Sequence, residues 1–346
     1  MKIAINGFGR LGRAIARAAL AREITIVGIN DIANSENLAY LLEKDSVHGE
    51  LDYKVRYENH ALAFSPKDTL PRSASISKTG QLKSAPKPIP IFSYANPLEL
   101  DFGAADVVIE SSGHFLSSEQ VSHHLAKGAR RVIISAPAID DTPTFVLGVN
   151  HTAYAGESII SNASCTTNCL APIAMLLDRE FGIERAIITT IHSYTNDQNL
   201  LDVAHHSDKR RSRAAGLNII PTSTGAARAL YKVLPDMKGK IHGHSVRVPV
   251  ADVSMLDCNV YLKRSVDERT ITELFIAESS GALAGILGMD SEYGVSSDFY
   301  NDTRSAIVAQ DLTFCLENMC KIMAWYDNEW GYAHRILDMA AHILTR

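Results

Sequence analysis

The opening of the chain places a strand, a glycine-rich turn, a helix and a second strand in direct succession. Apolar residues 2–6 predict a strand, and Gly7-Phe8-Gly9-Arg10-Leu11-Gly12 follows it at once. Apolar residues at helical spacing then run to Leu20, and a second apolar stretch, residues 24–29, ends at Asn30-Asp31. Two strands joined through a helix in this way predict a parallel βαβ unit, and so an α/β domain at the start of the chain.

The glycine pattern of this unit indicates a ligand. Glycines permit the tight turn and let the backbone approach a pyrophosphate at the helix N-terminus. Asp31, a little over ~20 residues after the turn, can accept hydrogen bonds from ribose hydroxyls and would repel a 2′-phosphate. The sequence therefore predicts a dinucleotide site that favours NAD, although aspartate is also common as a plain turn residue.

A second informative stretch lies near the middle of the chain, at Ser161-Asn162-Ala163-Ser164-Cys165-Thr166-Thr167-Asn168-Cys169. Strand-like residues precede it, and residues 170–177 continue with helical spacing. The unpaired N–H groups and the dipole of a helix N-terminus favour anions and lower the pKa of a thiol. We therefore expect Cys165 to be a nucleophile with a lowered pKa beside a small-anion site.

Composition excludes several classes of function. The 346 residues carry a net charge of −5, with 46% hydrophobic and 21% charged residues, and no run approaches the ~18 apolar residues of a membrane span. We expect no nucleic-acid or membrane partner, and a cytoplasmic location, because the chain enters a strand without a leader pattern. Five scattered cysteines predict no disulfide framework, and the histidine pairs lack a second ligand cluster, so we predict no metal.

The stretch around Cys165 resembles the active-site motif of the phosphorylating glyceraldehyde-3-phosphate dehydrogenases of bacterial type. The resemblance continues over nearly the whole chain, in the family's order. Its further motifs are Ala4 to Arg10, Lys44 to Gly49, Ser135 to Ala138, His192-Ser-Tyr-Thr-Asn-Asp-Gln198, Ile220 to Gly225, Arg247-Val-Pro249 and Trp325 to Tyr332.

This resemblance implies an architecture of two domains. Residues 1–163 would form a Rossmann NAD-binding domain, to which a C-terminal helix, residues 331–346, returns. Residues 164–330 would form an α+β catalytic domain whose mixed, largely antiparallel sheet provides the surface of a homotetramer.

The resemblance also implies roles for single residues. Cys165 would attack the aldehyde of glyceraldehyde 3-phosphate, and His192 would be the base. Thr195 and Arg247 would bind the substrate phosphate, with Asp197 orienting the arginine. The attacking inorganic phosphate would be surrounded by Ser164, Thr166, Arg213, Thr224 and Gly225, whereas Arg210 and Arg211 are expected to be solvated. The cofactor set would comprise Gly7, Phe8, Gly9, Arg10, Leu11, Asn30, Asp31, Ser112, Gly113, Ser135, Asn328 and Tyr332.

Some positions depart from the family pattern. Ile32 resembles the NAD-preferring type, whereas Ala204 matches neither the usual proline nor the serine of relatives that accept NADP. NAD is therefore favoured, and some use of NADP stays open. Residues 65–90 are rich in serine, proline and lysine and are expected to form an exposed loop, with a basic docking patch as the alternative.

The predicted reaction is the oxidation of glyceraldehyde 3-phosphate by NAD, with phosphate releasing 1,3-bisphosphoglycerate, as in glycolysis and gluconeogenesis. Erythrose-4-phosphate dehydrogenase is the alternative within enzymes, and Tyr194-Thr195-Asn196 favours the triose. A binding or adaptor protein without turnover is the alternative of a different class, and the intact Cys165 and His192 argue against it.

Overall fold

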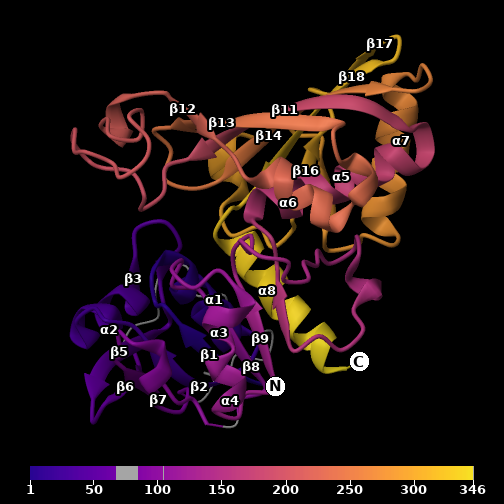
Figure 1. Cartoon of the computed structure of the whole chain (residues 1–346). Helices are drawn as coiled ribbons and strands as arrows, with labels where there is room; N and C mark the ends of the chain where they lie inside the picture. Colours follow the sequence, from indigo (N-terminus) through magenta and orange to yellow (C-terminus); the bar gives the residue numbers. More distant parts are fainter. Residues whose placement is uncertain (68–84, 104, 346) are drawn as a thin grey trace. The chain divides into compact units, whose positions relative to one another are not determined.

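The computed structural model describes residues 1–67, 85–103 and 105–345. They cluster into two units, which Figure 1 shows with their helices and strands labelled. Unit 1 comprises Met1–Thr142, Gly156–Ile160 and Ala340–Thr345, and unit 2 comprises Pro143–Ala155 and Ser161–Met339. Most of the predicted loop at residues 65–90 lies outside the described residues.

This division differs from the predicted boundaries at two places. The segment Pro143–Ala155, placed in the first domain by the sequence, clusters with unit 2, and so does the larger part of the C-terminal helix. That helix is held by local contacts: Tyr332 donates to the Ala163 carbonyl at 2.8 Å and Arg335 to the Gly285 carbonyl at 3.1 Å. Its early turns therefore belong with the catalytic half of the chain.

Unit 1 is built around a sheet that is mostly parallel. In the described part of the chain its order is β10-β9-β8-β1-β2-β7-β6-β5. Neighbours from β9 to β7 run parallel, and β5, β6 and β7 are antiparallel. The strands are β1 Lys2–Asn6, β2 Thr25–Asn30, β5 Tyr53–Glu58, β6 Ala61–Pro66, β7 Ile89–Phe92, β8 Val107–Glu110, β9 Arg131–Ile134 and β10 Ile159–Ser161, with a small separate pair, β3 Lys44–Asp45 and β4 Gly49–Glu50.

The predicted βαβ unit is present, and its central strands are fully buried. Ile3, Ile5 and Ile109 have no exposed surface, as expected for strands covered on both faces. Two short helices, α3 and α4, follow each other and meet at Ser122, whose backbone is itself in the right-handed helical region. The helices of this unit are α1 Arg10–Ala21, α2 Ser35–Glu43, α3 Ser118–Val121 and α4 His123–Ala126, with the 3₁₀ turn η1 Pro97–Glu99.

Unit 2 contains a mixed sheet in which antiparallel pairs dominate. Its order is β12-β13-β11-β14-β18-β16-β15, and β17 pairs with β18. Only β11 with β13 and β15 with β16 run parallel among the described pairs. The strands are β11 Ile183–Ser193, β12 Ile220–Ser223, β13 Ile241–Val248, β14 Ser254–Leu262, β15 Leu287–Asp290, β16 Ala306–Ala309, β17 Phe314–Leu316 and β18 Met319–Tyr326.

Helices cover one face of this sheet, as Figure 1 shows for α5, α6 and α7. The helices in this part of the chain are α5 Cys165–Phe181, α6 Ala226–Val233, α7 Glu268–Ser280 and α8 Trp330–Leu344, with 3₁₀ turns η2 His151–Ala153, η3 Ala215–Leu217, η4 Pro235–Met237 and η5 Ser296–Phe299. Leu170, Ile173 and Leu177 of α5 are buried in one core with Leu256 and Ile322 of the sheet. Each such side chain stabilises the unit by about 1.5–3 kcal/mol, so packing holds α5 against the sheet.

Candidate active site

Cys165 is the first residue of α5, and His192 is the last but one residue of β11. The Ser164 hydroxyl caps α5 by accepting from the Thr167 N–H at 3.1 Å. Cys165 Sγ lies 3.7 Å from His192 Nε2. The two residues predicted to share the chemistry are therefore within hydrogen-bonding reach of each other.

Arg247 lies beside the histidine because of the strand register. The parallel strands β11 and β13 pair His192 directly with Arg247. The Arg247 Nη1 atom is 2.7 Å from His192 Nδ1 and donates to the Ser193 carbonyl at 2.9 Å. Burial, followed by the charge of Arg247, lowers the pKa of His192 to about 3. The imidazole is therefore neutral at pH 7 and able to act as a base.

The Nδ1 atom of His192 lies between a donor and an acceptor. Arg247 Nη1, which can only donate, is 2.7 Å away, and the Ser193 carbonyl oxygen, which can only accept, is 2.8 Å away. A proton on Nδ1 satisfies the carbonyl and leaves the Nε2 lone pair directed at Cys165 Sγ, whereas a lone pair on Nδ1 satisfies Arg247. Base catalysis at Nε2 requires the first of these tautomers.

The protonation of Cys165 differs from the prediction. Burial raises the pKa of the Cys165 thiol above its ordinary value, and this outweighs the lowering by the Thr166 hydroxyl and by the charge of Arg247. The sequence predicted a lowered pKa because it identified the helix N-terminus but not the surrounding apolar core. The thiol form therefore dominates at rest, and the neutral His192 becomes necessary to remove its proton.

The turn that precedes Cys165 is strained. Ala163 has a φ of 57°, in the left-handed region that a residue with a Cβ seldom occupies. Hydrogen bonds hold it there, from Tyr332 Oη to the Ala163 carbonyl and from Asn168 Nδ2 to the Asn162 carbonyl at 2.9 Å. Such strain persists where the surroundings enforce it, typically at active sites.

Tyr326 is a buried residue that the sequence reasoning gave no role. Its hydroxyl group bonds with Thr166 Oγ1 at 3.0 Å and with Thr190 Oγ1 at 2.6 Å. It therefore joins the end of β18 to α5 and β11. The predicted phosphate ligand Thr166 already uses its hydroxyl in this contact. The motif from Trp325 to Tyr332 was the only signal for this residue.

Two of the predicted anion-binding contacts are corrected by the loop that follows β11. Asp197 was expected to orient Arg247; its charge opposes the lowering of the pKa of Arg247 by burial, while its carboxylate accepts from the Thr195 hydroxyl and pairs with Arg211. Arg213 was expected at the phosphate, but its side chain is largely exposed and pairs with Asp202 at 2.8 Å.

Arg211 is therefore the loop arginine that this structure brings to the site. Its charge also contributes to lowering the pKa of both His192 and Arg247. The backbone turns between residues 211 and 213, so the two arginines pair with different aspartates. Arg211 pairs with Asp197, and Arg213 pairs with Asp202.

Thr224 and Gly225 connect β12 to α6. Gly225 is the N-cap of α6 and makes no side-chain cap, and Thr224 Oγ1 accepts from the Ala226 N–H at 3.2 Å. The start of α6 thus offers backbone N–H groups of the kind that bind anions.

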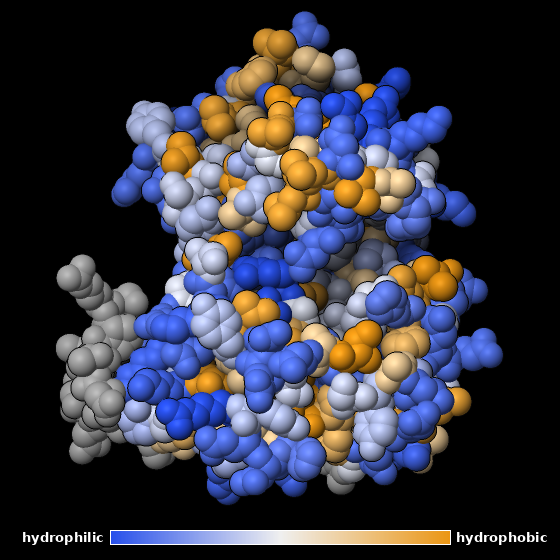
Figure 2. Space-filling view, turned by 90° about the vertical axis from the view of Figure 1, so that its left-hand side faces the viewer, coloured by the Kyte–Doolittle hydropathy of each residue, from blue (hydrophilic) through white to orange (hydrophobic). Residues whose placement is uncertain are grey.

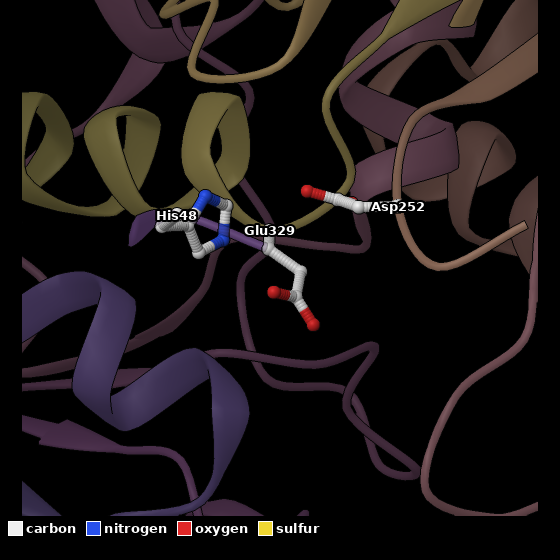
Figure 3. A group of neighbouring side chains, drawn as sticks. All are labelled: His48, Asp252 and Glu329. Atoms are coloured by element: carbon white, nitrogen blue, oxygen red, sulfur yellow. The ribbon is translucent and has the colours of Figure 1, made fainter. Parts of the chain in front are cut away.

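Three carboxyl groups interact where β14 begins and β18 ends. Asp252 is fully buried, and burial together with the charges of Asp327 and Glu329 raises the pKa of Asp252 far above its usual range. Asp327 accepts from the backbone N–H groups of Asn301, Glu329 and Trp330 at 2.8, 3.0 and 2.6 Å. Figure 3 shows Asp252 and Glu329; His48, also drawn, belongs to unit 1. Asp252 therefore carries a proton at neutral pH.

In unit 1 the predicted nucleotide residues lie at the carboxyl ends of β1, β2 and β8. Gly7 has a φ of 92°, and a Cβ there would overlap the backbone of Ser112. Gly9, the N-cap of α1, has no side-chain cap, and a Cβ added to it would meet nothing within 4 Å. Asp31 Oδ2 accepts from the Phe8 N–H at 2.6 Å, which fixes the turn. An open helix N-terminus beside a carboxylate is the arrangement that a dinucleotide requires.

The other cofactor residues of the prediction surround this edge. Gly113 has a φ of 76°, and Arg10 pairs with Asp45 at 2.7 Å. Ser135 Oγ donates to the Glu110 carbonyl at 2.9 Å. Leu11 lies in the first turn of α1, and Asn30 ends β2. The other two predicted residues, Asn328 and Tyr332, belong to unit 2.

A buried polar chain that the sequence did not predict supports the same edge. Asn30 donates to Asn6 Oδ1 at 2.9 Å, Asn6 donates to Glu110 Oε2 at 2.6 Å, and Ser112 donates to Glu110 Oε1 from both its N–H, at 2.9 Å, and its hydroxyl, at 2.5 Å. It ties β2, β1 and β8 together at their carboxyl ends. The sequence feature that could have predicted this polar chain is the polar residue at the end of each of these three apolar strands.

Comparison with known proteins agrees with this geometry. Residues 1–118 match the family model described as glyceraldehyde 3-phosphate dehydrogenase, NAD binding domain, and residues 164–328 match the C-terminal domain of the same family. The chain belongs to the glyceraldehyde-3-phosphate dehydrogenase family.

Full-length relatives carry the same family name. The protein named glyceraldehyde-3-phosphate dehydrogenase in Helicobacter pylori strain J99 is 49% identical over 350 residues, which cover 98% of each chain. Glyceraldehyde-3-phosphate dehydrogenase 1 of Bacillus cereus is 44% identical over 352 residues, covering 100% of this chain and 99% of the relative. A protein of Pinus sylvestris named as the cytosolic enzyme is 44% identical over 349 residues, covering 99% and 97%.

Membership of the glyceraldehyde-3-phosphate dehydrogenase family confirms several predictions. The Rossmann and largely antiparallel architecture is confirmed, and so is the assignment to NAD-dependent oxidoreductases. The comparisons do not favour erythrose-4-phosphate dehydrogenase or a non-catalytic protein. Within the part of the chain that the structure describes, no helix combines the length and apolar character needed to cross a membrane.

Proposed function

We propose that this chain oxidises glyceraldehyde 3-phosphate with NAD and inorganic phosphate to 1,3-bisphosphoglycerate. The observation that carries the proposal is the Cys165 thiol at the start of α5, with the neutral His192 Nε2 3.7 Å from its sulfur. The names of the full-length relatives support the substrate.

The first step is the attack of sulfur on the aldehyde. His192 Nε2 accepts the thiol proton, and the Cys165 thiolate forms a C–S bond with the aldehyde carbon. The carbonyl oxygen takes up the proton, which gives a thiohemiacetal. The Cys165 N–H at the helix N-terminus can stabilise the developing oxyanion, a contribution of about 2.7–4 kcal/mol per donor in comparable sites.

Oxidation and release follow at the same sulfur. NAD, when bound, supplies the acceptor for the hydride that leaves the thiohemiacetal carbon. His192 removes the hydroxyl proton in the same step, and Cys165 is left as a thioester. An oxygen of inorganic phosphate then attacks the thioester carbon, the C–S bond breaks, and Cys165 departs as thiolate.

Two groups of side chains would hold the two phosphates. Thr195 and Arg247 would bind the phosphate of the substrate. The attacking phosphate would lie near the start of α6 at Thr224 and Gly225, with Ser164 and Thr166 at the start of α5. Arg211 takes the place that the sequence gave to Arg213, because Arg211 Nε donates to Thr222 Oγ1 at 2.9 Å, on β12 two residues before Thr224. A guanidinium suits this role because its planar fork binds phosphate oxygens in pairs.

For the cofactor we propose NAD in preference to NADP. The turn from Gly7 to Leu11, with Asp31, would hold the pyrophosphate and the adenosine ribose. The Asp31 carboxylate would repel a 2′-phosphate, and the exposed Ile32 beside it offers no charge to neutralise one. Ser112, Gly113 and Ser135 would line the groove, and Asn328 and Tyr332 would lie at the nicotinamide.

We further propose that the chain assembles as a homotetramer. The loop after β11 and the segment around η3 expose large apolar side chains, among them Leu200, 90% exposed, and Leu217, 79% exposed. Figure 2 views the molecule from the side on which this loop lies, and apolar side chains appear there among polar ones. Exposed apolar surface of this kind is typical of an interface. A mass in solution of four times 37.8 kDa is expected by light scattering.

The location that fits this reaction is the cytoplasm, where phosphorylated sugars and NAD occur. One relative, from Pinus sylvestris, is named as cytosolic. Fractionation of cells that express the chain at its native level would test this.

The experiment that tests the reaction follows NADH formation by the purified protein. Glyceraldehyde 3-phosphate with NAD is compared with and without inorganic phosphate, and then with NADP and with erythrose 4-phosphate. Fast, phosphate-dependent reduction of NAD with the triose is expected. Faster turnover of the tetrose, or turnover that ignores phosphate, would move the assignment to another dehydrogenase.

A further inference from the structure

The side chain of Asn328 is held by two buried serines. Its Oδ1 accepts from Ser193 Oγ at 3.0 Å and from Ser254 Oγ at 2.6 Å. Both serines are essentially without exposed surface, and Asn328 is 8% exposed. An amide oxygen has two lone pairs, so both acceptor positions of this side chain are occupied from within the protein.

The hydrogen-bond balance fixes which end of the amide faces the serines. Ser254 Oγ also accepts from the Ser193 N–H at 3.2 Å. With Oδ1 toward the serines, each hydroxyl hydrogen has an acceptor. With the amide reversed, the NH₂ group would fill the acceptor positions of the hydroxyls, and among the described residues their own hydrogens would find no buried acceptor. Asn328 therefore turns Nδ2, a donor, away from the two serines.

Backbone strain at one residue supports the placement of Ser254. Val253, immediately before it, has a φ of 65° and is buried against Phe299 and Ile307. A β-branched residue in the left-handed region is a true outlier, and such outliers cluster where a side chain must be aimed. The carbonyl of Ser193, in turn, accepts from Arg247 and contacts His192 Nδ1. The amide thus belongs to the same rigid framework as the reacting pair.

We propose that Ser193 and Ser254 are positioning residues that lock the Asn328 amide, so that only its Nδ2 donor meets the nicotinamide carboxamide. The inference rests on the proposed function, in which Asn328 contacts that group. The lock makes the site selective for a carbonyl oxygen at the carboxamide and indifferent to the carboxamide NH₂.

Two dinucleotide analogues separate these properties. The thionicotinamide analogue replaces the acceptor oxygen by sulfur, a weaker acceptor, and the 3-acetylpyridine analogue keeps the oxygen but lacks the NH₂ group. Equilibrium titration of the unmodified chain should rank the acetyl analogue close to NAD and the thio analogue several-fold weaker. The opposite ranking would show that Oδ1 faces the ligand, and would overturn the lock.

Serine variants test the cause of the ranking. The double variant Ser193→Ala with Ser254→Ala should bind NAD about three- to tenfold more weakly and lose its preference for NAD over the thio analogue. Ser245→Ala is the matched control, because Ser245 is a 2% exposed serine of β13 whose hydroxyl has no partner among the described residues. This control variant should change neither the affinity for NAD nor the preference for NAD over the thio analogue.

The outcomes separate this inference from the proposed function. A parent chain that fails to bind NAD overturns both. A parent that binds NAD, with serine variants that keep its affinity and its ranking of analogues, overturns the lock alone. If circular dichroism shows that the double variant does not fold, Asn328→Asp tests the same point. It keeps the acceptor for the serines, removes the Nδ2 donor, and should also lose the preference for the oxygen analogue; an unchanged preference overturns the lock.

Discussion

The two units of this chain build their sites in different ways. In unit 1 the turn and the helix N-terminus that form the centre of the nucleotide edge lie within the first thirty-one residues. In unit 2 the chemistry depends on side chains that are distant in the sequence. His192 is 27 residues from Cys165 and 55 from Arg247, and Tyr326 is 160 residues from Thr166.

The two sites depend on the rest of the fold to different degrees. A glycine turn places its N–H groups through local backbone geometry, and neighbouring strands need only hold its two ends. The catalytic pair needs the register of β11 with β13, the start of α5 and the end of β18 at once. Substitutions in unit 1 should therefore act through shape, and substitutions in unit 2 through protons and charges.

The largest expected effect tests the side-chain chemistry of unit 2. Cys165→Ser should lower kcat by about 10⁴-fold or more, because a hydroxyl is a far weaker nucleophile than a thiolate. Initial rates of NADH formation measure it. The control is Cys169→Ala, one turn further along α5 and fully buried, which should keep its rate within a few-fold. A Cys165→Ser rate near that of the parent would exclude the covalent route.

The loop arginines provide the next test. Arg211→Ala should raise the KM for inorganic phosphate by about 10- to 100-fold, because charged hydrogen bonds contribute ~1.5–3 kcal/mol. Arg213→Ala, which removes only the exposed pair with Asp202, should change it less than threefold. Rates measured against phosphate concentration give the KM of each variant. A larger increase in KM for Arg213→Ala than for Arg211→Ala would support the prediction made from the sequence.

Two glycine variants test whether backbone shape governs the nucleotide edge of unit 1. Gly9→Ala should weaken NAD binding about tenfold at an unchanged unfolding temperature, because the new methyl group enters open space that the pyrophosphate needs. Gly7→Ala should lower the stability by at least ~1–3 kcal/mol, because of its positive φ and the overlap with Ser112. Calorimetric titration and thermal melts distinguish the two. Equal melting points for both variants would contradict the backbone argument.

The smallest effect concerns pH. Because the pKa of Asp252 is raised in the folded state, the folded chain holds a proton that the unfolded chain releases above about pH 4. Stability attributable to this group therefore falls as pH rises from there toward the folded pKa. Asp252→Asn should be more stable by on the order of 1 kcal/mol, and by more at pH 8 than at pH 5. Thermal melts of the variant and the parent chain at both pH values measure this difference. A stability difference that becomes smaller as pH rises would show that Asp252 is not protonated in the folded chain.

The sequence predicted more of unit 1 than of unit 2. The βαβ unit and its glycine turn are present as predicted, because their geometry is local. In unit 2 the identity of the reacting pair came from motifs, whereas the partners of Asp197, Arg211 and Arg213 depend on how one loop folds.

By itself the sequence determined the family, the dinucleotide turn and the residues able to react, because these reside in contiguous motifs. The tertiary structure decided which of those residues are charged and which way they point. A buried core raises the pKa of Cys165, and burial with Arg247 keeps His192 neutral. Desolvation and charge come from strands far apart in the chain, and only the folded protein brings them together.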